Sequence, residues 1–408
     1  YADPVTDPTP TPDPRERRRP WWRRVHPLDV VRVGLLMLGL LAVATGVLPW
    51  TAAKQTGARV GPLLVFLAGV VVLAELAAKA QVFDLVAERV ARLAGGRTTA
   101  LFALSVALAS ATTAFLNLDT TAVLLTPVLI AVAVRVGLPP LPAAMTTVWL
   151  ANAASLLLPV SNLTNLLAHD TLGMTPTGFA ARMVLPQVAS VVVVAFCLWI
   201  FYWRGAPPRF TPPERSGPRH PQVFVAASVA CMLFVAAVVA DVDVAIAAPV
   251  AAAVVVAAYL VWDRDELTWD LLPWRLLVLV VGLFLVVDTL GRLGVSDAMA
   301  AAIGTDSGAA GVGRAAAVGG VLANLLNNLP VYLAGEAVVP HAHTDQLLGL
   351  LIGVNVGPIV LPWGTLATLI WAERCHAAGV GISWRRFALT GLVTAVVATV
   401  AATAALLV

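Results

Sequence analysis

Two polar segments interrupt long apolar runs and carry side chains that can bind a small solute. Residues 152–166 read NAASLLLPVSNLTNL, and residues 355–369 read NVGPIVLPWGTLATL. Their amides and hydroxyls can donate and accept hydrogen bonds, and their prolines remove backbone donors and leave carbonyls free. The candidate binding residues in these segments are Asn152, Ser155, Ser161, Asn162 and Asn165, then Asn355, Thr365 and Thr368.

Two more polar clusters lie at the centres of the apolar stretches 99–136 and 314–340. The cluster ATTAFLNLDTTAVLLTP (111–127) and the cluster ANLLNNLPVYL (323–333) contain neither Arg nor Lys. A multiply charged anion is usually bound by cationic groups, so this composition favours a small neutral hydroxylated solute or a cation. A single Ser or Thr could equally hydrogen-bond within its own helix. The candidates here are Asn117, Asp119, Thr120 and Thr121, then Asn327 and Asn328.

Asp119 is the carboxylate within these clusters, and it has two interpretations. An ionisable group inside a membrane is a functional candidate, and burial favours its neutral form, so Asp119 could bind and release a proton near neutral pH. Alternatively, the side chain caps the hairpin by accepting hydrogen bonds from backbone N–H groups.

The overall composition is that of a polytopic α-helical membrane protein. Of 408 residues, 59% are hydrophobic and 12% are charged, and the mean hydropathy is +0.87. A soluble domain has about a quarter charged residues, and a helix needs about twenty apolar residues to cross a bilayer. The three cysteines have no metal-ligand spacing, so we expect them to be small core residues. The predicted spans are 28–50, 60–80, 142–170, 182–203, 222–240, 244–262, 274–292, 346–373 and 386–408.

The two stretches with polar centres are predicted to be helix–turn–helix hairpins. Each half is too short to cross alone, and non-helical backbone at that depth must be buried or line a cavity. With the Arg-rich N-terminus in the cytoplasm, this topology puts most Lys and Arg residues on the cytoplasmic side, as the positive-inside rule requires.

The polar pattern occurs twice, which predicts inverted repeats. Residues 63–84 align with residues 276–297, so that Gly69 faces Gly282 and Glu75 faces Asp288. Each of these acids has a cation four residues on, which favours a helical ion pair. The predicted fold is an all-α polytopic membrane protein with two inverted repeats, each with a re-entrant hairpin and a broken transmembrane helix, plus scaffold helices. The predicted parts are a disordered basic tail (1–27), repeat 1 (28–203), a cytoplasmic linker (204–221), an extra transmembrane helix (222–243) and repeat 2 (244–408).

The motifs SNLTNLLAHD (161–170), LANLLNNLP (322–330) and GPIVLPWGTLATLIW (357–371) resemble ArsB-type arsenite/antimonite efflux transporters of the ion-transporter superfamily. The resemblance implies export of trivalent arsenite or antimonite in exchange for protons, by a transport domain that moves against a scaffold. Arsenous acid is mostly neutral at pH 7 and resembles a small polyol, which suits a site of amides and hydroxyls. The resemblance assigns the site to Asn117, Asp119, Ser161, Asn162, Asn165, Asn327, Asn328, Gly364, Thr365 and Thr368.

The function expected is therefore a secondary active transporter of the cell membrane, with a cytoplasmic N-terminus and Asp119 as its proton site. The tip sequence, with Leu118 between Asn117 and Asp119, is also similar to sodium/proton antiporters, which are the alternative. A sodium-coupled dicarboxylate carrier is disfavoured because the motifs lack cations.

The expected partners are the substrate, protons and the lipid bilayer. The chain has no GxxxxGK[ST] phosphate-binding loop, so a soluble arsenite-stimulated ATPase, if used, would be a separate partner. We expect no enzymatic activity, no cofactor and no nucleic-acid partner.

Overall fold

The computed structural model describes residues 27–214, 217–306, 308–340 and 342–408. The regular secondary structure of these residues is helical, and the β pairing among them is an isolated bridge between Arg97 and Arg209. Nine of the described helices are long and apolar enough to cross a membrane, which confirms the predicted polytopic α-helical class. The predicted tail, 1–27, lies almost entirely outside the described residues.

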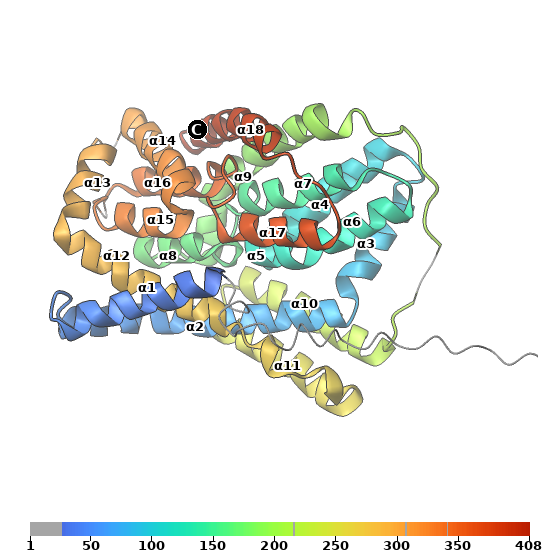
Figure 1. The fold of residues 1–408 in the computed structure, drawn as a ribbon, viewed down its shortest axis with the longest axis horizontal. Helices are drawn as coiled ribbons and strands as arrows, with labels where there is room; N and C mark the ends of the chain where they lie inside the picture. The colour runs from blue at the N-terminus through green and yellow to red at the C-terminus, as the bar shows by residue number, and fades with distance from the viewer. Residues whose placement is uncertain (1–26, 215–216, 307, 341) are drawn as a thin grey trace, which may run out of the picture.

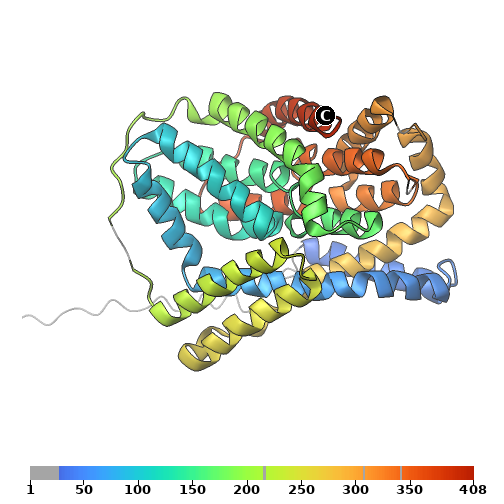
Figure 2. The ribbon, with the colours of Figure 1, turned by 180° about the vertical axis from the view of Figure 1, so that it is seen from behind.

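Long helices form one layer of the molecule, which we call the scaffold layer. It lies along the lower side of Figure 1, and Figure 2 shows the same layer from behind. Its members are α1 (Pro27–Ala44), α2 (Trp50–Lys79), α10 (Pro221–Val239), α11 (Val244–Trp262) and α12 (Trp274–Leu290).

Within the scaffold layer, helices from the two halves of the chain pack closely on each other. A Cβ on Gly69 of α2 would lie 2.6 Å from the backbone nitrogen of Pro249 in α11. A Cβ on Gly282 of α12 would lie 2.5 Å from the nitrogen of Leu36 in α1. Gly69 and Gly282, which the sequence aligns, therefore play the same part: each has no side chain, so a helix from the other half of the chain can pack directly against the glycine's backbone.

The rest of the chain forms an upper body that contains two chain reversals. α4 (Thr98–Phe115) turns at Asn117, whose φ is 129°, and the chain returns through α5 (Leu118–Thr120), η3 (Thr121–Leu125) and α6 (Thr126–Arg135). The end of this return arm lies beside α3 (Val82–Leu93), because Arg135 is 3.8 Å from Glu88. α3 also precedes the first arm, so both arms end on the same side.

The second reversal repeats this arrangement at the other end of the molecule. α14 (Ala309–Leu326) turns at Asn327, whose φ is 86°, and continues as α15 (Asn328–Glu336). Both arms contact α13 (Ser296–Ile303), and Arg314 Nε donates to the carbonyl of Ala302 at 2.7 Å. α3 and α13 thus join the scaffold layer to the upper body at opposite ends (Figure 1).

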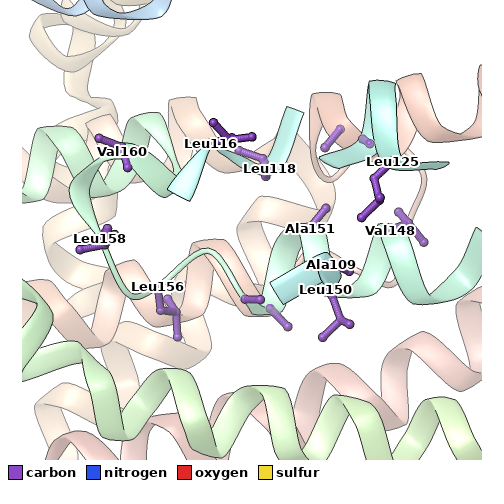
Figure 3. Packing of buried hydrophobic residues seen from close by; sticks show 14 of the residues in the cluster. Ala109, Leu116, Leu118, Leu125, Val148, Leu150, Ala151, Leu156, Leu158 and Val160 are labelled. Atoms are coloured by element: carbon purple, nitrogen blue, oxygen red, sulfur yellow. The ribbon is translucent and has the colours of Figure 1, made fainter. Parts of the chain in front are cut away.

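Two helices of the upper body are interrupted at the polar segments, as the sequence predicts. α7 (Pro140–Ala153) and α8 (Leu163–Leu172) flank the first break, and α16 (Thr344–Val356) and α17 (Leu366–Ala377) flank the second. Figure 3 shows Leu156, Leu158 and Val160 of the first break in one apolar cluster with Leu116 and Leu118 of the first reversal. The first break is therefore held inside the protein, where non-helical backbone is tolerated.

Several predicted boundaries differ from the structure. α2 begins at Trp50 rather than near residue 60, because the segment 51–59 holds Ala, Lys, Gln and Arg, which favour helices. The arm α4 has 18 residues and spans about 27 Å at 1.5 Å per residue, so its length does not prevent a crossing. The prediction that each arm is too short was therefore wrong for both arms of the first reversal and for α14, whereas α15, with nine residues, is too short to cross. For the first reversal, the return of both arms to α3 is the better argument for a hairpin.

Of the two ion pairs predicted for the aligned acids, the structure shows one and not the other. Arg292 Nε lies 3.3 Å from Asp288 Oδ1, as expected. Lys79 instead lies 2.9 Å from Glu266 Oε2, in the segment between α11 and α12, so the expected pair of Lys79 with Glu75 is wrong.

Candidate functional site

A cavity of about 230 Å³ lies between the scaffold layer and the tips of the two reversals. Amides and one carboxylate from the upper body face apolar side chains of α1, α2 and α12 across it. Its lining includes Asn117, Asp119, Asn162, Asn327, Asn328, Val160, Leu163 and Pro330 from the upper body, and Val31, Arg32, Phe66, Leu67, Leu276 and Leu283 from the scaffold layer.

The structure brings five of the predicted site residues to this cavity: Asn117, Asp119, Asn162, Asn327 and Asn328. The other predicted residues are not among the described residues that line it. These are Thr120, Thr121, Asn152, Ser155, Ser161, Asn165, Asn355, Gly364, Thr365 and Thr368. Nine of these ten residues, all but Gly364, have polar side chains, and these side chains are buried.

At the first tip, Asn117 rather than Asp119 caps the helix. Asn117 Oδ1 accepts a hydrogen bond from the backbone N–H of Thr120 at 2.8 Å. The Asp119 carboxylate forms no hydrogen bond or ion pair with any described residue and faces the cavity. The alternative that Asp119 is a hairpin cap is therefore wrong.

The threonines that follow Asp119 stabilise the first reversal from within. Thr121 Oγ1 is 2.9 Å from Thr113 Oγ1 and donates to the carbonyl of Asn117 at 3.1 Å. Thr120 is buried and supplies the backbone N–H that Asn117 caps.

Asn355 joins the two interrupted helices through a buried hydrogen-bond network. Its Oδ1 accepts from Asn162 Nδ2 at 3.0 Å and from Thr164 Oγ1 at 2.7 Å. Its Nδ2 donates to Asn165 Oδ1 at 2.7 Å. Thr164, Asn165 and Asn355 are fully buried, so the network holds the two breaks together behind the cavity wall.

Each break is also bonded to the tip beside it. Ser161 Oγ donates to the carbonyl of Ala114 at 2.9 Å, at the end of α4. In the second half, Asn327 Nδ2 donates to the carbonyl of Trp363 at 3.1 Å, and the N–H of Asn328 donates to the carbonyl of Gly364 at 2.9 Å. The tips and breaks therefore form one connected unit in each half.

Other predicted polar residues form hydrogen bonds with residues three or four positions away, as expected if they bond locally rather than to a solute. Asn152 Nδ2 donates to the carbonyl of Val148 at 2.9 Å, and Ser155 Oγ donates to the carbonyl of Asn152 at 2.7 Å. Thr365 Oγ1 accepts from the N–H of Thr368 at 3.2 Å and so caps α17.

Asn324 organises the second break and was missed by the sequence reasoning, although it lies inside the motif LANLLNNLP. Its Nδ2 donates to the carbonyl of Gly357 at 2.9 Å. Its Oδ1 accepts from the backbone N–H groups of Val360 and Leu361 at 3.2 and 3.1 Å. An Asn one helical turn before a tip asparagine was the signal for this role.

Arg32 of α1 is a second cavity residue that the sequence reasoning missed, since the four polar clusters contain no cation. Its Nη1 lies 2.6 Å from Asp29 Oδ1, and Arg275 Nε lies 3.4 Å from the same oxygen. Asp29 therefore offsets part of the positive charge at this end of the cavity.

Of the polar groups that the upper body contributes to the lining, three remain free to bind a solute. Asn117 Nδ2, the Asn328 side chain and the Asp119 carboxylate form no hydrogen bond with the described residues. By contrast, Asn327 and Asn162 each already use both their oxygen and their nitrogen. Two amides and one carboxylate can bind a small hydroxylated solute or exchange a proton. Among the described residues, no group of three His, Cys, Asp or Glu side chains could hold a metal ion.

Several known membrane proteins are similar to this chain in sequence. The arsenical pump membrane protein of Escherichia coli is 26% identical over 350 residues, covering 79% of this chain and 81% of that protein. The arsenical pump membrane protein of Yersinia enterocolitica is also 26% identical, with the same coverage. The putative arsenical pump membrane protein of Bacillus subtilis is 23% identical and covers 76% of this chain and 79% of its own length.

Among solved structures, the YdaH transporter of Alcanivorax borkumensis, described as having an unusual topology, has a similar fold. The TM-score is 0.58 at 13% identity, over 93% of this chain and 97% of that one. Residues 24–347 match the family CitMHS, described as citrate transporter. The chain is therefore a multi-pass membrane transport protein rather than an enzyme, and it belongs to the CitMHS citrate transporter family.

Proposed function

We propose that this protein exports arsenite or antimonite from the cell in exchange for protons. The arsenical pump membrane proteins to which it is similar support this substrate. The observation that carries the proposal is the lining of the cavity, where free groups of Asn117 and Asn328 lie with the Asp119 carboxylate. A neutral trihydroxy acid can donate to and accept from such groups without a cationic partner.

The architecture we propose is a pair of inverted repeats around this cavity. Repeat 1 covers 28–203 and repeat 2 covers 244–408, with the linker 204–221 and the extra helix 222–243 between them. The reversals at Asn117 and Asn327 act as re-entrant hairpins, and each interrupted helix is a broken transmembrane helix. The aligned close contacts at Gly69 and Gly282 support this symmetry.

The cavity supports an inward-facing state. Arg32 lies in the second turn of α1 and Leu276 in the first turn of α12, and both line the cavity. With a cytoplasmic N-terminus, as the positive-inside rule favours, these turns lie at the cytoplasmic side of the membrane.

In the proposed cycle, arsenous acid enters this cavity and hydrogen-bonds to Asn117 and Asn328. The upper body then moves against the scaffold layer and releases the solute outside. A proton that binds the Asp119 carboxylate from outside drives the return. Asn162 in the cavity wall and Asn165 and Asn355 behind it keep the two breaks together during the movement.

A sodium/proton antiporter is the second candidate, because the Asp119 carboxylate is free to bind a cation. Sodium would also need nearby oxygen ligands. The hydroxyl of Thr121 instead bonds to Thr113 and to the carbonyl of Asn117. This observation favours the arsenite exporter.

The test uses purified protein in liposomes, with arsenite movement followed under a pH gradient and then under a sodium gradient. We expect flux with the pH gradient and its loss in Asn328→Ala. Arsenite-independent proton movement driven by sodium would support the antiporter, and citrate movement without arsenite movement would show an anionic substrate. Stimulation by a soluble ATPase in the same vesicles would identify that partner.

A further inference from the structure

A second cavity, of about 410 Å³, lies between the same two layers near the N-terminal end of α2. Its polar wall comes from α2, from α12 and from the residues that follow α12 up to the start of α13, and the α15 region supplies apolar residues opposite. The lining includes Gln55, Thr56, Arg59, Asp288, Arg292 and Ser296, together with Phe284, Leu333, Ala334 and Ala337. We call this end the Arg59 side and the opposite end the Arg32 side.

A thin barrier separates the two cavities. On α15, Leu329 and Pro330 line the central cavity, and Leu333, less than one turn later, lines the second. On α12, Leu283 lines the central cavity, and the next residue, Phe284, lines the second. Phe284 and Leu333 are buried, so they close the path between the cavities with apolar side chains.

An ion pair with a buried carboxylate joins the two layers on this same side. Arg59 Nη2 of α2 lies 2.7 Å from Glu336 Oε2 of α15 and donates to Thr171 Oγ1 of α8 at 3.0 Å. Thr171 Oγ1 donates to Glu336 Oε1 at 2.6 Å, and the Tyr332 hydroxyl donates to the same oxygen at 3.3 Å. The Glu336 side chain is only 5% exposed, so its charge depends on these partners.

We propose that the cluster Arg59–Glu336–Thr171 is the latch of the gate on the Arg59 side, and that the second cavity is the route by which substrate leaves once the latch opens. The proposal rests on the alternating access proposed above, because the latch joins the parts that must move apart. It assigns positioning roles to Arg59 and Glu336, neither of which lines the central cavity.

The physical reason is the cost of separating the pair. When the layers part, Arg59 retains access to water, since its side chain is 37% exposed, but Glu336 must find new solvation. The pair therefore favours the state in which the two layers meet on this side. Replacing Glu336 with a neutral side chain removes that preference and increases the fraction of molecules open toward the Arg59 side.

The test is the reaction of an engineered cysteine with a membrane-impermeant thiol reagent, applied to each side of proteoliposomes in turn. Leu283→Cys places the thiol in the central cavity, in a background where Cys197, Cys231 and Cys375 are replaced by Ser. We expect the parent to react from the Arg32 side and to react slowly from the Arg59 side. Glu336→Gln should raise the rate from the Arg59 side at least tenfold.

Matched variants separate a latch from general loosening. Glu75→Gln changes a half-buried acid near the other end of α2 and should leave the rate from the Arg59 side unchanged. The exchange Arg59→Glu with Glu336→Arg should restore the slow rate, and Arg59→Gln provides a second opening variant if Glu336→Gln does not fold.

An unchanged rate in folded Glu336→Gln or Arg59→Gln would overturn the proposal. An equal rise in Glu75→Gln would do so as well. The labelling needs neither arsenite nor protons, so a chain that moves no arsenite but shows the expected rates would refute only the proposed function.

Discussion

Asn355 and Asn152 occupy equivalent positions before the two breaks, yet their substitution should have different effects. Both are buried asparagines. Asn355→Ala leaves Asn162 Nδ2, Thr164 Oγ1 and Asn165 Oδ1 without a partner in a buried setting. A buried polar group left unpaired costs about 1–3 kcal/mol, and hydrogen bonds between membrane helices average about 0.6 kcal/mol. At about 1 kcal/mol per group, the expected loss of stability is about 3 kcal/mol.

Asn152→Ala is the matched control, because it deletes the same atoms. Asn152 makes one side-chain bond, to the carbonyl of Val148 in its own helix, and its Oδ1 is unpaired among the described residues. The expected cost is therefore about 1 kcal/mol or less. At about 2 °C per kcal/mol, Tm should fall by about 6 °C for Asn355→Ala and by about 2 °C for Asn152→Ala.

The assay is thermal unfolding of the purified protein in detergent, followed with a thiol-reactive dye. Cys197 and Cys375 are buried and become reactive only when the upper body opens. Equal losses in the two variants would refute the reasoning, because they would show that Asn355 contributes through its volume rather than through its bonds between helices.

Three further outcomes are expected. Asp119→Asn should abolish arsenite flux driven by a pH gradient, and full flux would contradict its proton role. The same variant should shift Tm by less than about 1 °C, because the carboxylate has no partner among the described residues. Gly282→Val should lower stability by about 1–3 kcal/mol because its Cβ meets α1, whereas Gly34→Val, with open space around it, should cost less in the same melting assay. The hydrogen bond from Lys79 lowers the pKa of Glu266, so this pair stabilises the fold above the ordinary value of 4.5 and loses its effect as pH falls through the lowered pKa. Melting curves from pH 7 to pH 3 should show this loss, of at most about 1 kcal/mol, in the parent but not in Glu266→Gln.

The sequence predicted the positions of the breaks because proline and short polar residues are costly in an apolar helix unless the protein satisfies them. The first break falls between Ala153 and Leu163, and the second falls between Val356 and Leu366, inside the quoted motifs. The start of α2 was missed because the apolar run begins near residue 60, whereas the helix already begins at Trp50. The residues between them favour a helix but add no apolar pattern that would show it.

The direction in which each polar residue faces could not be predicted. Whether Asn328 faces the cavity and Asn355 faces another helix depends on how each helix is rotated in the packed fold. Arg32 was missed for a related reason, because α1 reaches the site only through its packing on α12, a helix distant in sequence.

The close contact of Gly282 with Leu36 has a consequence for how the protein is made. α1 leaves the ribosome before α12, the surface on which it packs, because α12 follows more than two hundred residues later in the chain. At about 5–20 residues per second, α1 waits in the bilayer on the order of tens of seconds before its partner arrives. The pairing of α2 with α11 is delayed in the same way, so assembly of the scaffold layer depends on the second half of the chain. Two fragments divided in the linker should therefore become stable only when both are synthesised in the same membrane.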